Sequence, residues 1–188
     1  TFNGQAGTIT IPGGGNGGGG GGTFRLTLPD RTAEPNTQVC LNMATEGFTN
    51  IVSWQFHLRY DPARLEFASV GSFNPTVPGL GAQSVTTPGQ GVVQPGRIVF
   101  GWDSPSSTPV TLTDGSTLLQ VCFNVLATGG PTTVSFSNDQ LPFEARNSSG
   151  TILPFNFRNS TITVAGGPNS DTFRLSLPDA TAESGTQV

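Results

Sequence analysis

Apolar and polar side chains alternate along most of this chain. In VSWQFHLRY, residues 52–60, every second side chain is apolar and polar residues fill the positions between them. The same period of two recurs in GRIVFGWD (96–103) and LLQVCFNV (118–125). Side chains of a strand point alternately to its two faces, so this period predicts strands that bury one face. We find no window with a convincing helical stripe.

The alternation also predicts which side chains form the core. The inward positions are Val52, Trp54, Phe56, Leu58, Tyr60, Leu65, Phe67, Ile98, Phe100, Trp102, Leu119, Val121, Phe123, Val125, Val134, Phe136, Ile162 and Val164. Gly, Pro, Asn and Ser separate the strand-like segments, as turn residues do. Short strands joined by such turns predict an all-β fold, an antiparallel β-sandwich with jelly-roll or Greek-key connections.

The two ends of the chain repeat parts of its middle. TFRLTLPDRTAEPNTQV (23–39) and TFRLSLPDATAESGTQV (172–188) are identical at 13 of 17 positions, and TFNGQAGTITIPGG (1–14) resembles PFNFRNSTITVAGG (154–167). The first match has an offset of 149 residues and the second an offset of 153. Self-similarity at nearly the same offset indicates a repeat architecture. We divide the chain into the C-terminal strand region of a preceding repeat (1–14), a Gly-rich linker (15–22), a complete repeat (23–165), a linker (166–171) and the first strand of a following repeat (172–188).

A glycine tract, GGGNGGGGGG at 13–22, separates the first partial copy from the complete repeat. A phosphate-binding P-loop needs Lys followed by Ser or Thr after its last glycine, and no Lys follows this tract. Any polyglycine satisfies a GxGxxG pattern, so that match carries no weight. As a flexible coil the tract spans roughly 16–19 Å, which is the property of an inter-repeat linker.

The charge of the chain excludes several classes of partner. Only 11% of residues are charged and the formal net charge is −4. The sequence contains no basic stripe that could neutralise phosphates, so we expect neither nucleic acid nor an anionic membrane surface as a partner. It also contains no run of 18 apolar residues, so we expect no membrane span.

Four segments follow one another in a distinctive order: TQVCLNM, VSWQFHLRYDPARLEFASV, PGRIVFGWDSPSSTPVTLTDGSTLLQVCFNVLATG and TITV. This order resembles that of the cohesin family, the modules of cellulosome scaffoldins. The family's motifs match at Tyr60-Asp61-Pro62, Leu65-Glu66, Gly96-X-Ile98 before Trp102, and Gly115-X-X-Leu118-Leu119. The resemblance covers about residues 23–165 and implies a nine-stranded, cohesin-like sandwich. It also implies pairing with a dockerin through one sheet face.

The two cysteines, Cys40 and Cys122, occupy polar positions of their strands, so alternation directs both outward on one face. The family resemblance places these two strands side by side. A cross-strand disulfide follows if the register sets the residues opposite one another, and it would indicate an oxidising compartment. Two separate, half-buried thiols are the alternative. A metal site is disfavoured, because two Cys without CxxC spacing and one His cannot complete a tetrahedral shell.

The sequence offers no convincing catalytic set. His57 is the only histidine, and alternation places it on the outward face, where we expect a surface side chain. Asp61, Glu66, Asp103 and Asp114 could supply a carboxylate pair of the glycosidase kind, but Asp61 and Asp114 belong to turns. We therefore expect neither an enzyme nor a cofactor.

Two further residue pairs have alternative interpretations. Trp54 and Trp102 would form a sugar-stacking platform if they faced outward, whereas their alternation with Phe56 and Phe100 favours the core. Asn147 and Asn159 each begin an N-x-[ST] triplet, the acceptor pattern for N-glycosylation in a secreted host context.

These patterns lead to two functional hypotheses. The first is a structural repeat unit of a secreted, extracellular or cell-surface fibre, stalk or adhesin, whose partners are other copies of the same repeat and whose units could assemble by β-strand donation. The alternative is a binding module on an extracellular scaffold, with a dockerin-like module or a glycan as its partner.

Overall fold

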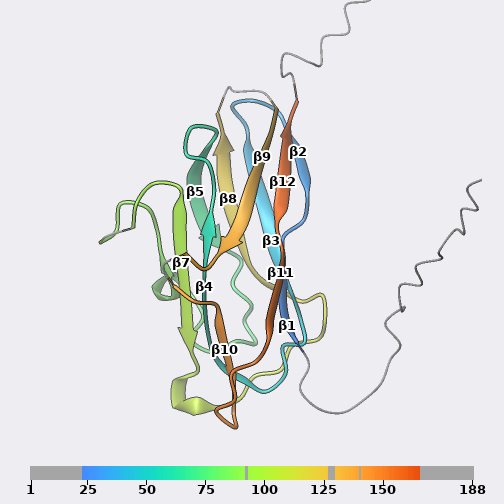
Figure 1. Ribbon diagram of the computed structural model, residues 1–188, viewed down its shortest axis with the longest axis vertical. Coiled ribbons are helices and arrows are strands. Elements are labelled where there is room, and N and C mark those ends of the chain that lie inside the picture. Colours follow the sequence, from blue (N-terminus) through green and yellow to red (C-terminus); the bar gives the residue numbers. More distant parts are fainter. Residues whose placement is uncertain (1–22, 92, 127–129, 140, 166–188) are drawn as a thin grey trace, which may run out of the picture.

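The computed structural model describes residues 23–91, 93–126, 130–139 and 141–165 (Figure 1). These residues form β1 (Phe24–Thr27), β2 (Arg31–Ala33), β3 (Gln38–Glu46), β4 (Ile51–Arg59), β5 (Leu65–Gly71), β6 (Val85–Thr86), β7 (Arg97–Asp103), β8 (Thr117–Val125), β9 (Gly130–Ser137), β10 (Glu144–Asn147), β11 (Phe155–Arg158) and β12 (Ser160–Val164). Two short 3₁₀ helices, η1 (Ala82–Ser84) and η2 (Pro105–Ser107), flank β6 and β7.

The strands form two sheets that pack face to face. One sheet, here the β3–β8 sheet, has the order β11-β1-β3-β8-β5. The other, here the β4–β7 sheet, has the order β2-β12-β9-β4-β7-β6, and β10 pairs with β4 beyond the end of β9. Figure 1 shows β1 toward one end of the long axis and the end of β12 at the opposite end.

The predicted all-β sandwich is confirmed, and both sheets are mixed. Most neighbours are antiparallel, but β1 pairs with β11 and β2 with β12 in parallel. The described residues hold twelve strands where nine were predicted. Two of the additional strands arise because β1/β2 and β11/β12 are each one extended segment that passes from one sheet to the other. Pro29 lies at the first crossing, where a residue without an N–H cannot continue a ladder.

The core lies between the two sheets, and alternation predicted most of it. Phe56 stacks on Phe100 with ring centroids 4.9 Å apart, and Trp54 stacks on Trp102 at 6.1 Å. Phe24, Leu26, Leu41, Met43, Leu58, Leu65, Ile98, Leu119, Val121, Phe123, Val134 and Ile162 join them at zero exposure. Two predicted core positions, Val52 and Phe67, are only half-buried.

One glycine fixes the return of β7 alongside β4. Gly96 has a φ of 85°, and a Cβ at this position would lie 2.8 Å from the backbone oxygen of Tyr60. The amide of Tyr60 donates to the carbonyl of Gly96 at 3.0 Å. Only glycine combines this backbone conformation with such a close approach. The turn therefore sets the register in which β7 pairs with β4.

The glycine tract and both partial copies, residues 1–22 and 166–188, lie outside the described residues. The predicted linkers and flanking repeat segments therefore stay predictions. Within the described residues, none of the helices has the length and apolar character needed to cross a membrane.

Candidate functional site

The outer side of the β4–β7 sheet carries a row of polar side chains, which includes two residues considered in the sequence analysis, His57 and Asp103. Cross-strand partners point to the same side of a sheet. The outward pairs between β4 and β7 are Ser53 with Asp103, Gln55 with Gly101, His57 with Val99, and Arg59 with Arg97. These residues, together with Asp139, Glu144 and Arg146, form what we call the β4–β7 face.

Asp139 is the centre of a charged cluster on this face. Its Oδ1 lies 2.7 Å from Nε2 of His57 and accepts from the Ser137 hydroxyl at 2.9 Å. Its Oδ2 accepts from Nη2 of Arg59 at 2.6 Å and from Nη2 of Arg97 at 3.0 Å. A carboxylate shared by two guanidinium groups, an imidazole and a hydroxyl holds side chains of β4, β7 and β9 in one arrangement.

An interruption between β9 and β10 brings Asp139 to this place. β9 pairs with β4 as far as Ser137 opposite His57, and pairing resumes with Glu144 opposite Gln55. The chain between these two points leaves the ladder, so Asp139 reaches the outer face. The carbonyl of Pro142 in the same segment accepts from Nε2 of Gln55 at 3.2 Å.

The surroundings set the protonation of both partners. Desolvation lowers the pKa of His57 below its ordinary value of 6.5, and it outweighs the hydrogen bond and the charge of Asp139, which act to raise it. For Asp139, partial desolvation acts to raise the pKa. Hydrogen bonds from Ser137 and His57 and the charges of Arg97 and Arg59 together lower the Asp139 pKa below 3.8. At neutral pH His57 is therefore uncharged and donates from Nε2 to a carboxylate.

The prediction that His57 is a surface side chain is wrong. It does point outward, but its side chain is only 1% exposed. Asp139 binds its ring nitrogen, and the ring of Phe143 lies 6.5 Å from the imidazole. Both covering residues come more than 80 positions later in the sequence. Local alternation contains no signal for such a cover.

Two hollows lie at the two ends of the β4–β7 face. One, about 230 Å³, is lined by Ser53, Trp54, Gln55, Gly101, Trp102, Asp103, Glu144 and Arg146. The other, about 340 Å³, is lined by Arg59, Tyr60, Pro62, Gln94, Pro95, Gly96 and Arg97. Gly101 leaves the first hollow open, because a Cβ there would meet nothing within 4 Å.

The charges of the face are separated along the strands. The first hollow has two carboxylates, Asp103 and Glu144, and one cation, Arg146, which is paired with Glu144. The second hollow has two cations, Arg59 and Arg97, next to the Asp139 cluster. One end is therefore acidic and the other is basic. Such a face is complementary to a partner with the opposite polarity.

The carboxylates considered for catalysis have separate structural roles. Asp61 accepts from the amide of Ala63 at 2.9 Å, and Asp114 accepts from the amide of Gly47 at 2.8 Å. Glu66 accepts from Nδ2 of Asn124 at 3.2 Å on the other sheet. Among the described residues, no group of three or more His, Cys, Asp or Glu could hold a metal ion.

Trp54 and Trp102 are core residues, with exposures of 2% and 3%. Nε1 of Trp102 donates to the carbonyl of Pro78 at 2.9 Å, which satisfies its polar edge inside the protein. Neither ring is available for a sugar to stack on. Of the two alternatives in the sequence, the core interpretation therefore holds.

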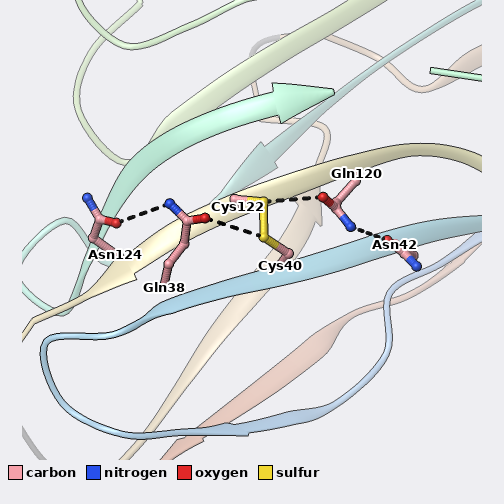
Figure 2. Close-up of a disulfide and its surroundings, with 6 residues drawn as sticks. All are labelled: Gln38, Cys40, Asn42, Gln120, Cys122 and Asn124. Carbon is pink, nitrogen blue, oxygen red and sulfur yellow. Dashed lines mark hydrogen bonds between the residues drawn. A yellow bond between two sulfur atoms is a disulfide. The ribbon is translucent and has the colours of Figure 1, made fainter. Parts of the chain in front are cut away.

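The outer side of the β3–β8 sheet carries the two cysteines. Cys40 is the register partner of Cys122, with Cα atoms 4.1 Å apart, and their sulfur atoms are bonded. Figure 2 shows two amide pairs flanking this disulfide: Gln120 donates to Asn42 at 2.7 Å, and Gln38 donates to Asn124 at 3.5 Å. QVCLN in β3 and QVCFN in β8 thus form a local antiparallel ladder of polar, uncharged side chains.

Both sequon asparagines have local backbone partners. Oδ1 of Asn147 accepts from the amides of Ser149 and Thr151 at 3.0 Å each. Oδ1 of Asn159 accepts from the amide of Phe136 at 3.0 Å, and Asn159 is exposed. Glycosylation at Asn147 and Asn159 stays a prediction.

Comparison with known proteins decides the family. The family model of the cohesin domain matches residues 24–154. This chain belongs to the cohesin family. Cohesin domains are non-catalytic binding modules, so the expectation that the chain is not an enzyme is confirmed. Cohesins are usually carried on extracellular scaffolds, and a disulfide fits that setting.

Solved cohesin structures share the fold at low identity. A cohesin from Clostridium acetobutylicum is 18% identical with a TM-score of 0.64, covering 78% of this chain and 93% of its own. The sixth cohesin of scaffoldin B from Acetivibrio cellulolyticus, solved in complex with a Cel5 dockerin, is 21% identical with a TM-score of 0.61, covering 76% and 99%. A non-cellulosomal cohesin from the archaeon Archaeoglobus fulgidus is 16% identical with a TM-score of 0.58, covering 77% and 93%. No curated protein sequence matches the chain.

Proposed function

We propose that this cohesin is a protein-binding module that recognises a dockerin-type partner through the β4–β7 face. Several of its structural relatives were solved in complex with dockerins. The observation that carries the proposal for this chain is the Asp139 cluster between two hollows of opposite charge.

The face is suited to binding because its side chains are already held in place. Arg97 is only 11% exposed in its side chain, and Asp139 fixes it together with the more exposed Arg59. Side chains that are already fixed lose less conformational freedom on binding than side chains that the partner must order. The proposed partner places acidic groups near Arg59 and basic groups near Asp103 and Glu144.

The glycan alternative has lost its structural support. It depended on an aromatic platform from Trp54 and Trp102, and both rings are buried. A sugar can stack only on an exposed ring face, so we favour a protein partner.

The test is calorimetric titration of the chain with purified dockerin modules, including those encoded in the same genome. Binding to at least one of them, weakened by Arg59→Glu, supports the proposal. A full panel that releases no heat, with the cohesin folded by circular dichroism, contradicts it. The charge-preserving variant Arg59→Lys is the matched control, although it gives up the planar fork of the guanidinium.

We further propose that the module is one unit of a tandem array on a secreted or cell-surface scaffold. The 13 identities between residues 23–39 and 172–188 support this role, as does the glycine tract between copies. Repetition would present several binding faces on one polypeptide and raise avidity without new contacts. Mass analysis of the native protein tests it: a product with a single cohesin unit would contradict the array.

A fibre or stalk joined by β-strand donation is the stronger form of this second role. It predicts that a protein of three units resists chaotropes far better than a protein of one unit. Independent units would instead unfold at the same denaturant concentration, and equal midpoints would remove strand donation while leaving the array intact.

A further inference from the structure

The first and last strands of the unit form one continuous parallel seam. Phe24 of β1 pairs with Phe155 of β11, and Ala33 of β2 pairs with Val164 of β12, with a constant offset in the register. The seam is what holds the N-terminal segment in place, together with β3. We call the site that β1 and β2 occupy, bounded by β3, β11 and β12, the β1–β2 slot.

The slot holds its occupant through contacts with buried aromatic and aliphatic side chains. Phe24 makes edge contacts with Phe48 at 5.5 Å and Phe155 at 4.8 Å between ring centroids. Leu26 and Leu28 are fully buried. Three apolar side chains at alternate positions therefore define the pattern that fits.

Polar contacts fix the register of that occupant. Nη1 of Arg25 donates to Glu46 of β3 at 3.2 Å. Asp30 accepts from Nη2 of Arg158 at 2.6 Å and from the amide of Thr161 at 2.8 Å. A strand shifted by one residue would lose these pairs and would turn its apolar side chains outward.

Residues 172–188 repeat the residue types that make these contacts in β1 and β2. The counterparts of Phe24, Arg25, Leu26, Leu28 and Asp30 are Phe173, Arg174, Leu175, Leu177 and Asp179. The four differences fall at Thr27, Arg31, Pro35 and Asn36, none of which is buried. Asn36 has a φ of 59°, and its counterpart is glycine, which adopts that conformation freely. The copy thus differs only where the slot tolerates change.

The copy cannot easily reach the slot of the unit that precedes it in the same chain. Val164 ends β12 beside Ala33, and the start of the slot at Phe24 lies nine residues back, roughly 30 Å in extended chain. Nine residues separate Val164 from Phe173, and a coil of that length spans about 15–18 Å. Occupying the slot of the preceding unit would require nearly full extension, whereas the slot of a second molecule imposes no such span.

We propose that residues 172–182 are a donor strand for the β1–β2 slot of a second copy of this chain. This inference rests on the proposed array role and names the segment, slot and partner of its strand donation; dockerin binding does not enter it. In the intact chain, β1 occupies the slot because it belongs to the same polypeptide as the strands around it. Exchange is therefore expected when the resident strand is weakened or leaves.

Three variants of the full chain test the proposal: Leu26→Asp in the resident strand, Leu175→Asp in the copy, and both together. The readouts are light scattering after size-exclusion chromatography and thermal melting followed by tryptophan fluorescence. We expect the first variant to form dimers or larger species with a cooperative melt. The second should remain a stable monomer, and the double variant should lose its melt.

Two results would overturn the exchange between chains. One is a Leu26→Asp variant that behaves like the double variant when the peptide described below restores neither of them. The other is a Leu26→Asp variant that stays monomeric and stable, because its own copy would then fill the slot. Neither result removes the array itself, whose test is the mass of the native protein.

A peptide experiment covers the case in which the variants fold poorly. A synthetic peptide of residues 172–183 is added to the double variant, and a peptide with Leu175→Asp serves as the control. Recovery of the melt with the first peptide alone supports the proposal. No recovery with either peptide contradicts it.

Discussion

Nε2 of His57, on a central strand, lies 2.7 Å from Oδ1 of Asp139, 82 residues later in the sequence. This contact ties the segment between β9 and β10 to the middle of the β4–β7 face. It also buries the only histidine of the chain against a carboxylate that two arginines share. The protonation of His57 is therefore coupled to the arrangement of the proposed binding face.

Stability should fall as the pH is lowered through the ordinary pKa of histidine. The pKa of His57 is depressed in the folded protein, so below pH 6.5 the unfolded chain binds a proton before the folded one does. The stabilisation is present above pH 6.5 and is lost as the pH falls, at no more than about 1.4 kcal/mol per pH unit. Urea unfolding between pH 8 and pH 5 measures it.

The matched variant for this prediction is His57→Gln, whose amide can still donate to Asp139. It should show a flat stability profile over the same pH range. A second loss begins below pH 3.8 in both proteins, because the pKa of Asp139 is also depressed. If the wild type and His57→Gln lose stability equally between pH 6.5 and pH 5, the buried neutral imidazole is not the cause.

Removing the disulfide should cost the unit about 2–5 kcal/mol in unfolding free energy. The bridge joins residues 82 apart in sequence, and closing a loop of that size restricts the unfolded chain strongly. Denaturant unfolding of the Cys40→Ser/Cys122→Ser variant measures the loss. A difference below about 1 kcal/mol would show that the β3–β8 pairing is sufficient without the cross-link.

Replacing Phe56 with alanine should destabilise the fold by about 3–5 kcal/mol. This ring is fully buried and lies between Phe100 and Phe136, at centroid distances of 4.9 Å and 5.7 Å. Phe157→Ala is the control, since that ring is 40% exposed and should lose much less. Equal losses in the two variants would contradict the assignment of Phe56 to the core.

Local alternation was enough to predict the sandwich and most of its core. The pairs Trp54 with Trp102 and Phe56 with Phe100 lie on the face that the period of two indicates. The outward direction of Cys40 and Cys122 also follows from alternation, whereas their adjacency came from the cohesin resemblance. The parallel seam was not predicted, because it depends on pairing between the two ends of the unit.

The candidate site was the least predictable part. Asp139 has no periodic signal, since it lies where the ladder between β9 and β4 is interrupted. Its partners His57, Arg59 and Arg97 come from two strands, and each taken alone looks like an ordinary solvated residue. Alternation predicts the side of the sheet on which His57, Arg59 and Arg97 lie, but only tertiary packing brings the carboxylate among them.

The most direct test of the account is a substitution at Gly101 that fills the first hollow of the β4–β7 face. Gly101→Arg introduces a long side chain where a Cβ meets no neighbour, so the fold should be retained. Asn42→Arg adds the same side chain to the opposite sheet, beside the disulfide. With a bound dockerin module as the probe, calorimetry should give at least about tenfold weaker binding for Gly101→Arg and a change within about twofold for Asn42→Arg. Unchanged affinity for Gly101→Arg, or equal losses in both variants, would contradict binding through the β4–β7 face.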